Sequence, residues 1–311
     1  INPFIVTGKI APEYFCDRVS ESARLVKSIT NGNNLVVISP RRMGKTGLIQ
    51  FCYDKPEIGK EYYTFFIDIL HTSSLREFTY LLGREIYETL LPRSRKMATL
   101  FIQTIKSISG KFGFDPISNL PTFNVELGDI ERPEYTLDEI FQYLAHADKP
   151  CIVAIDEFQQ IAEFKDSKTF QKRLRSIWQL QKSVSYCLFG SKKHLMNELF
   201  EKRSLPFYKF GDAIYLTKIG TADWVDYICG RFEATGKQIS KELAEKICQR
   251  VDNHSSYVQQ LAWLVWIHTD KVATEQDFEE AYQDIIDQNT PLFEKQTESL
   301  TTYQMNFLRA I

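Results

Sequence analysis

The segment SPRRMGKTG at residues 39–47 has the residue types that hold a nucleoside triphosphate. A phosphate-binding loop requires Gly, any four residues, Gly, Lys and then Ser or Thr. Gly44, Lys45 and Thr46 match this requirement, and Ser39 stands where the first Gly would be. Serine is small enough to make the tight turn at modest strain if its φ is negative. One position therefore departs from the pattern of a phosphate-binding loop.

The loop predicts a role for each of its polar groups. Its backbone N–H groups would face the phosphates, and the dipole of the following helix favours their negative charge. Lys45 would reach the β and γ phosphates, and the hydroxyl of Thr46 would coordinate Mg²⁺. Arg41 and Arg42 are candidates for contacts with phosphate or a neighbouring subunit, although exposed arginines are more often simply solvated. The predicted ATP-binding residues of the loop are Ser39, Pro40, Arg41, Arg42, Met43, Gly44, Lys45, Thr46 and Gly47.

Two adjacent carboxylates, Asp156 and Glu157, follow the apolar segment CIVAI at 151–155. Ligands bind at the carboxyl ends of strands in open α/β sheets, and buried carboxylates are costly unless a cation or water chemistry employs them. Asp156 is predicted to hold Mg²⁺ directly or through water, and Glu157 to orient and deprotonate the attacking water. The alternative is that the pair only caps the next turn. Together with the loop, the pair predicts binding of ATP and Mg²⁺.

Three further residues are candidates for weaker reasons. Ser191 ends the next strand, where a polar side chain can sense the γ-phosphate, and Gly190 lets the backbone come close, although serine is common in turns. Arg203 is a candidate arginine finger at an interface. His254 precedes a helix and is a candidate for a nucleotide contact or for a helix cap.

Strands and helices alternate through the first 220 residues. This alternation predicts a parallel sheet with helices on both faces. The expected strands are 35–38, 62–70, 151–155, 185–191 and 213–219. The expected helices between them are the segment after Thr46, 74–91, a helix capped by Thr136 with Glu139 three residues later, and 167–183. A polar stretch with Gly and Pro at 110–133 is the expected long loop or insertion.

The pattern changes to consecutive helices from about Thr221. The expected helices are 222–235, 240–251, 255–269 and 274–286. A chain of 311 residues is long enough for two cores. We therefore expect a second, helical domain, and we find no internal repeat.

Composition and charge narrow the possible partners. The net charge of −2, with 43% hydrophobic and 25% charged residues, is typical of a globular protein without a global positive field. The absence of an evident basic stripe argues against strong DNA binding. No apolar segment approaches the roughly 20 residues of a membrane span. Six scattered cysteines without metal-ligand spacing fit small buried side chains and a cytoplasmic location.

With these residues in view, the chain resembles the archaeal-type ATPase family of P-loop proteins, which belongs with the AAA+ and STAND ATPases. The resemblance extends over nearly the whole chain. It rests on Phe15, Arg18 and Glu21 as a Phe-x-x-Arg-x-x-Glu opening, and on the segments SPRRMGKT, AIDEFQQI, LFGSKKHLMNELF and PFYKF. The chain departs from the family pattern at Ser39, at Lys209 and Phe210 in place of Gly-Arg, and at Ser255 and Ser256 in the lid.

The resemblance implies a three-layer α/β/α sandwich with five parallel strands, a helical lid and the start of a winged helix. It implies an ATPase core at 1–220, a lid at 221–292 and a winged-helix beginning at 293–311. The nucleotide would lie between core and lid, with the adenine near Phe15 and Arg18 in an N-terminal segment, 1–30, that packs near it. Family members are mostly ATP-binding proteins whose downstream partner is unidentified.

Three functions follow from these observations. The first is a Mg²⁺-dependent ATPase whose hydrolysis drives a conformational switch, with Lys45, Glu157 and Ser191 as catalytic residues and slow turnover unless a protein partner or an oligomer completes the site. The second is a nucleotide-dependent switch that binds DNA or protein and hydrolyses little or no ATP. DNA would bind through a C-terminal winged helix. The third, a kinase or other phosphotransferase that shares the loop, would require an acceptor pocket and an arginine-rich lid, and the helices after Thr221 show neither clearly.

Overall fold

The computed structural model describes residues 2–4, 15–114, 121–298 and 300–310. The chain forms two compact units, which are described separately. The core unit comprises Arg18–Arg41 and Lys45–Thr217. The helical unit comprises Ile1–Asp17, Arg42–Gly44 and Lys218–Ile311.

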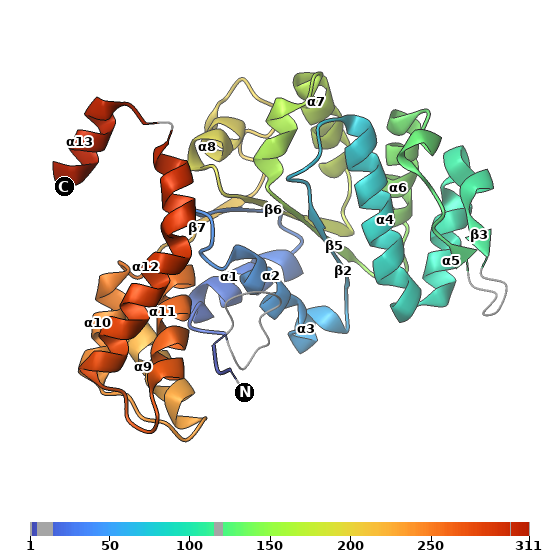
Figure 1. Cartoon of the computed structure of the whole chain (residues 1–311). Helices are drawn as coiled ribbons and strands as arrows, with labels where there is room; N and C mark the ends of the chain where they lie inside the picture. The colour runs from blue at the N-terminus through green and yellow to red at the C-terminus, as the bar shows by residue number, and fades with distance from the viewer. Residues whose placement is uncertain (1, 5–14, 115–120, 299, 311) are drawn as a thin grey trace. The chain divides into compact units, whose positions relative to one another are not determined.

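A five-stranded parallel sheet, in the order β2-β5-β6-β1-β7, forms the centre of the core unit (Figure 1). The strands are β1 (Leu35–Ile38), β2 (Tyr63–Asp68), β5 (Cys151–Asp156), β6 (Val184–Gly190) and β7 (Asp212–Tyr215). The register places Ile38 beside Gly190 and Asp68 beside Asp156. The carboxyl ends of β1, β5 and β6 therefore lie at one edge of the sheet. The predicted five-stranded parallel sheet is confirmed.

Helices cover both faces of this sheet (Figure 1). One face carries α1 (Val19–Thr30), α2 (Lys45–Tyr53) and α3 (Pro56–Gly59), and the other carries α4 (Leu75–Arg93), α6 (Pro133–Ala145), α7 (Ser167–Trp178) and α8 (Lys193–Glu201). The main core lies under the second set of helices, where Phe78, Leu174 and Met196 are fully buried. Trp178 and Tyr186 stack there with ring centroids 4.1 Å apart.

The predicted insertion contains only short elements. It is preceded by α5 (Arg95–Thr104) and η2 (Lys106–Lys111), and it contains β3 (Gly113–Phe114), β4 (Pro121–Thr122) and η3 (Leu127–Asp129). Part of the predicted loop, 115–120, falls outside the described residues. Phe123 attaches the insertion to the core by ring contacts with Tyr80 and Tyr87 of α4.

The predicted cap at Thr136 is wrong, because α6 begins one turn earlier, at Pro133. Proline is favoured in the first turn because its φ suits the helix and its missing N–H needs no partner there. Thr136 is buried inside the helix and shares a 2.8 Å hydrogen bond with the hydroxyl of Ser107. Glu139 accepts hydrogen bonds from the backbone N–H and hydroxyl of Ser107 instead of closing a capping box.

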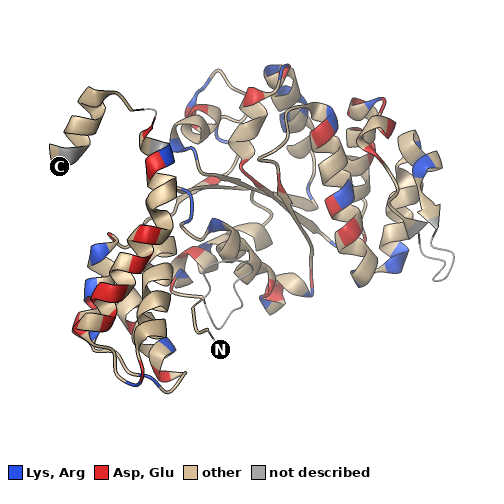
Figure 2. Ribbon diagram, in the orientation of Figure 1, with Lys and Arg blue, Asp and Glu red and all other residues tan. Residues whose placement is uncertain are grey.

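Helices and a separate core form the helical unit, as the change of pattern predicted. Its helices are α9 (Thr221–Glu233), α10 (Lys241–Arg250), α11 (Ser255–His268), α12 (Glu275–Thr297) and α13 (Thr302–Ala310). Phe4 from the N-terminal segment is buried in this core against Phe232. Helix α12 begins with a reciprocal capping box between Thr274 and Asp277 and continues past the predicted end at residue 286. Acidic residues recur along it (Figure 2).

The six cysteines are free thiols, and all but Cys229 are buried. Burial raises the pKa of Cys52, Cys151 and Cys248 to about 12. These thiols therefore act as small apolar side chains, as expected. Within the described part of the chain, no helix is long and apolar enough to cross a membrane.

Candidate nucleotide site

The turn after β1 accommodates serine without backbone strain. The φ of Ser39 is negative, whereas Arg42 has φ 61° and Gly44 has φ 84°. The N–H of Ser39 donates to the carbonyl of Gly190 at 3.2 Å, and its hydroxyl donates to the carbonyl of Pro40 at 2.9 Å. The left-handed conformation at Gly44 is the one that requires glycine. The condition under which serine is tolerated at position 39 is met.

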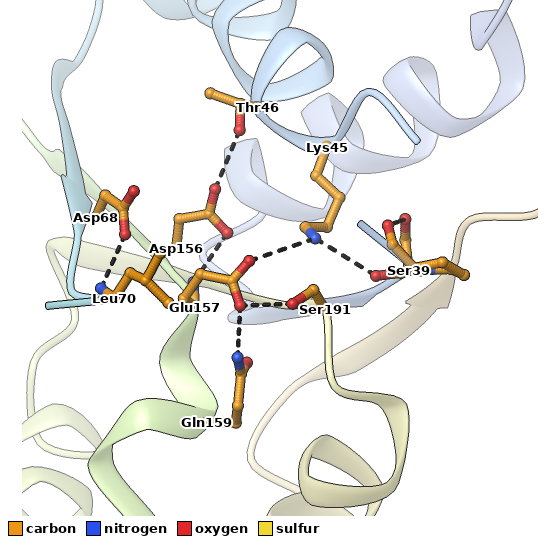
Figure 3. Close-up of polar contacts among 10 residues, drawn as sticks. Ser39, Lys45, Thr46, Asp68, Leu70, Asp156, Glu157, Gln159 and Ser191 are labelled. Carbon is orange, nitrogen blue, oxygen red and sulfur yellow. Dashed lines mark hydrogen bonds and ion pairs between the residues drawn. The ribbon is translucent and has the colours of Figure 1, made fainter. Parts of the chain in front are cut away.

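Lys45 begins α2 and is a buried cation, 6% exposed. Its Nζ donates to the carbonyl of Ser39 at 3.4 Å and lies 3.9 Å from Oε1 of Glu157 (Figure 3). Burial lowers the pKa of Lys45, and the negative charges of Asp156 and Glu157 oppose that effect. A buried ammonium near the end of β1 is placed to interact with an anion.

Asp156 ends β5 and is hydrogen-bonded to the first turn of α2 (Figure 3). The hydroxyl of Thr46 donates to Oδ2 of Asp156 at 3.0 Å, and the N–H of Glu157 donates to Oδ1 at 2.8 Å. Burial raises the pKa of Asp156 despite the nearby Lys45 charge. Mg²⁺ is commonly held by one or two protein oxygen ligands together with water and nucleotide phosphate. The adjacent hydroxyl and carboxylate fit this arrangement, although no three His, Cys, Asp or Glu side chains among the described residues form a metal cluster.

Glu157 is held by two hydrogen bonds to one carboxylate oxygen (Figure 3). Its Oε2 accepts from the hydroxyl of Ser191 at 2.6 Å and from Nε2 of Gln159 at 2.5 Å. Burial raises the pKa of Glu157, but these hydrogen bonds and the charge of Lys45 outweigh burial and lower it. Glu157 itself has φ 54°, a left-handed conformation at the turn between β5 and η4 (Phe158–Glu163). The carboxylate is thus ionised and fixed in direction.

Gln159 is a site residue that sequence reasoning missed. Its side chain is 1% exposed, and its Oε1 has no hydrogen-bond partner among the described residues. A Cβ atom at Gly190 would lie 2.6 Å from that Oε1, so glycine makes room for the amide. The sequence signal that could have identified Gln159 is its position two residues after Glu157, between the apolar residues Phe158 and Ile161, which are both buried.

The structure brings together six of the predicted residues in the core unit. The six are Ser39, Lys45, Thr46, Asp156, Glu157 and Ser191. Pro40 and Arg41 are exposed, and Gly47 lies within α2. The predicted residues that belong to the helical unit are Phe15, Arg42, Met43, Gly44 and His254.

The side chain of Arg18 has polar partners within the core unit, whereas that of His254 does not cap its helix. The guanidinium of Arg18 is buried and donates to Glu21 at 2.8 Å and to the carbonyl of Thr217 at 2.7 Å. His254 occupies the N-cap position of α11, but its side chain makes no capping hydrogen bond. Burial lowers the pKa of His254. Arg203 is exposed, and its predicted role at an interface stays a prediction.

The parallel sheet and the loop at the end of β1 define a P-loop nucleotide-binding fold. The chain belongs to a family of ATPase domains found predominantly in Archaea, whose model matches residues 15–261. This confirms the resemblance inferred from the sequence. Membership in the family supports ATP binding and ATP hydrolysis in general. No curated protein matches the chain.

Solved structures are similar to the chain in fold. A Walker-type ATPase of Pyrococcus abyssi is 15% identical, with a TM-score of 0.68 over 95% of this chain and 78% of that chain. The ORC2 protein of Aeropyrum pernix, in ADPNP-ADP complexes, is 13% identical, with a TM-score of 0.58 over 93% and 71%. The ORC1 protein of the same organism, in complex with DNA, is 11% identical, with a TM-score of 0.56 over 96% and 74%. At such identities the likeness shows the fold alone.

Proposed function

We propose that the protein is a Mg²⁺-dependent ATPase of the AAA+/STAND type, in which hydrolysis drives a conformational switch. The observation that carries this proposal is the position of Glu157 next to Lys45 at the carboxyl ends of the strands, with Ser191 fixing one carboxylate oxygen. In a protein of this family, such a carboxylate is suited to orient the attacking water.

The residues of the core unit would act in distinct ways. Lys45 would neutralise the β and γ phosphates, and Ser191 would respond to the γ-phosphate through its shared hydrogen bond with Glu157. Glu157 would accept a proton from water through Oε1, because Oε2 already accepts two hydrogen bonds. Thr46 and Asp156 would hold Mg²⁺, which supplies charge neutralisation at the phosphates when bound. Arg41, whose charge acts on both Lys45 and Glu157, would add positive potential.

The second candidate function is a nucleotide-dependent binding switch with little hydrolysis. The observation that favours it is α13, where Tyr303, Phe307 and Leu308 are 84%, 63% and 52% exposed. Such side chains are typical of a helix that packs against a further domain or partner. We also propose that 221–292 form a lid and that 293–311 begin a winged helix. Because α12 runs through residue 292 without a break, the two segments would share this helix. DNA or protein would then be the partner.

Phosphate release from ATP, measured with Mg²⁺ and again with EDTA, distinguishes the two functions when ATP binding is measured on the same samples. The ATPase proposal predicts binding and release with Mg²⁺ and no release with EDTA. Binding without release in both conditions would favour the switch. Release that is unchanged by EDTA would contradict the proposed role of Mg²⁺.

A further inference from the structure

One segment of the core unit has a strong positive charge that the net charge of the chain conceals. Residues 165–209 contain eleven Lys and Arg but only three Asp and Glu, whereas the whole chain has a net charge of −2. The expectation that the chain lacks a basic stripe is therefore wrong for this segment. Opposite charges elsewhere, including those along α12, cancel it in the total (Figure 2).

Five of these cations form a surface that we call the α7 basic stripe. It consists of Lys165, Lys168, Lys172, Arg175 and Lys209. Helical spacing of three and four residues puts its α7 members on one side of the helix, and Phe170, Leu174 and Trp178 on the other side are buried. The guanidinium of Arg175 lies over the ring of Phe210 at 5.0 Å, which brings the neighbouring Lys209 beside α7.

The stripe is not compensated by carboxylates. None of its five cations has a carboxylate within ion-pair distance among the residues that the structure describes, whereas nearby Lys192 and Lys202 are paired with Glu163 and Glu198 at 3.1 Å each. Like charges three or four residues apart destabilise a helix, and a cation in the first turn, such as Lys168, opposes the helix dipole. The arrangement therefore does not stabilise the free protein, and a bound polyanion would relieve the repulsion.

We propose that the α7 basic stripe binds the phosphate backbone of nucleic acid. Protein interfaces are depleted in Lys and have an apolar centre. Leu180 is the single exposed large apolar side chain within 165–209, so this surface lacks the apolar centre of a protein interface. From Lys168 to Arg175 the stripe extends about 10 Å along the helix, roughly the rise of three nucleotides on one strand. Because contacts to phosphate carry no sequence information, the binding would be independent of sequence.

The test is fluorescence anisotropy of a fluorescein-labelled DNA, as a duplex and as a single strand, titrated with the full chain at several salt concentrations. The triple variant Lys168→Gln, Lys172→Gln, Lys209→Gln is compared with the control Lys60→Gln, Lys96→Gln, Lys106→Gln. The control changes three exposed lysines of the same unit by the same total charge. Thermal melting and phosphate release verify that both variants fold.

The wild type is expected to bind at least one of the two DNA forms, with affinity that falls as salt rises. The stripe variant should bind at least about tenfold more weakly and lower the salt slope by up to about three, and the control should stay within about twofold. Equal weakening by both variants would overturn the proposal, since only net charge would then matter. Absence of DNA binding by the wild type would also overturn the proposal. Binding of labelled polyglutamate as tightly as DNA would overturn it too, because the stripe would then favour an acidic protein partner.

Discussion

Two clusters of charged side chains in this protein differ in their environment. In the core unit, Lys45 and Glu157 are 3.9 Å apart with side chains only 6% and 11% exposed. In the helical unit, Lys246 is 2.5 Å from Glu275 and 3.0 Å from Glu279, with 38%, 70% and 57% of these side chains exposed. The first cluster is desolvated, whereas the second remains in contact with water.

This difference in burial changes what each cluster contributes to stability. Exposed ion pairs contribute between zero and about 1 kcal/mol because water already solvates both partners. Burial of charges costs free energy, and a buried pair is therefore weak evidence for stability. The cluster around Glu157 also contains a carboxylate, Asp156, whose pKa burial raises. The proposed function assigns the buried cluster to nucleotide chemistry, whereas the ion pairs around Lys246 are exposed and screened by water.

The largest effect on binding is expected from Lys45→Met. The variant loses the buried cation that we propose faces the phosphates, so the affinity for Mg-ATP should fall by about a hundredfold. Calorimetric titration with ATP measures this. The matched control is Lys246→Met, for which ATP affinity should be unchanged. Equal affinities for the two variants would remove the distinction between the clusters.

Gln159→Leu is expected to have the next largest effect. The change removes a hydrogen bond to the charged carboxylate of Glu157, so kcat for phosphate release should fall about tenfold while KM changes little. Gly190→Ala should also lower kcat, because a Cβ there would lie 2.2 Å from Sδ of Met196 and 2.6 Å from Oε1 of Gln159 and would displace both side chains. If KM rises while kcat is unchanged, Gln159 does not position Glu157.

Asp156→Asn is expected to stabilise the nucleotide-free protein while weakening the binding of Mg-ATP. Because burial raises the pKa of Asp156, the folded protein holds the proton more tightly than the unfolded chain. The contribution of Asp156 to stability is therefore present below the ordinary Asp pKa and is lost as the pH rises above it. Asparagine is neutral at every pH, so the free energy of unfolding in urea at pH 7 should increase by about 1 kcal/mol. A decrease would indicate a structural role for the carboxylate.

The smallest effect is expected from Lys246→Met on stability. Its two ion pairs are exposed, so the free energy of unfolding should change by less than about 1 kcal/mol, and less still at high salt. A fall of several kcal/mol in the free energy of unfolding would show that the exposed cluster contributes to stability as strongly as buried groups do.

Much of the fold could be predicted from the sequence because the signals were local. The apolar strand CIVAI, the carboxylates Asp156 and Glu157 that follow it, and the helical periods of the second half each appear within a few residues. The cap at Thr136 was misplaced because two local signals compete, and Pro133 starts the helix before the capping pair can act. Contacts between distant segments, such as Ser107 with Glu139, leave no mark in a local pattern.

The candidate site was partly predictable for the same reason. Lys45, Thr46, Asp156 and Glu157 stand in short motifs, and the structure brings them together. Gln159 was missed because its role depends on the space that Gly190 leaves on another strand. The basic stripe was missed because a total charge cannot show where opposite charges lie.

Phosphate release from Mg-ATP by the wild type, Glu157→Gln and Glu279→Gln tests the central claim most directly. Both variants replace a carboxylate by an amide of the same shape, one in each cluster. We expect Glu157→Gln to bind ATP with nearly unchanged affinity and to release phosphate at least about a hundredfold more slowly, and Glu279→Gln to match the wild type. Release by Glu157→Gln at the wild-type rate would contradict the account, because the buried carboxylate would then not activate the water.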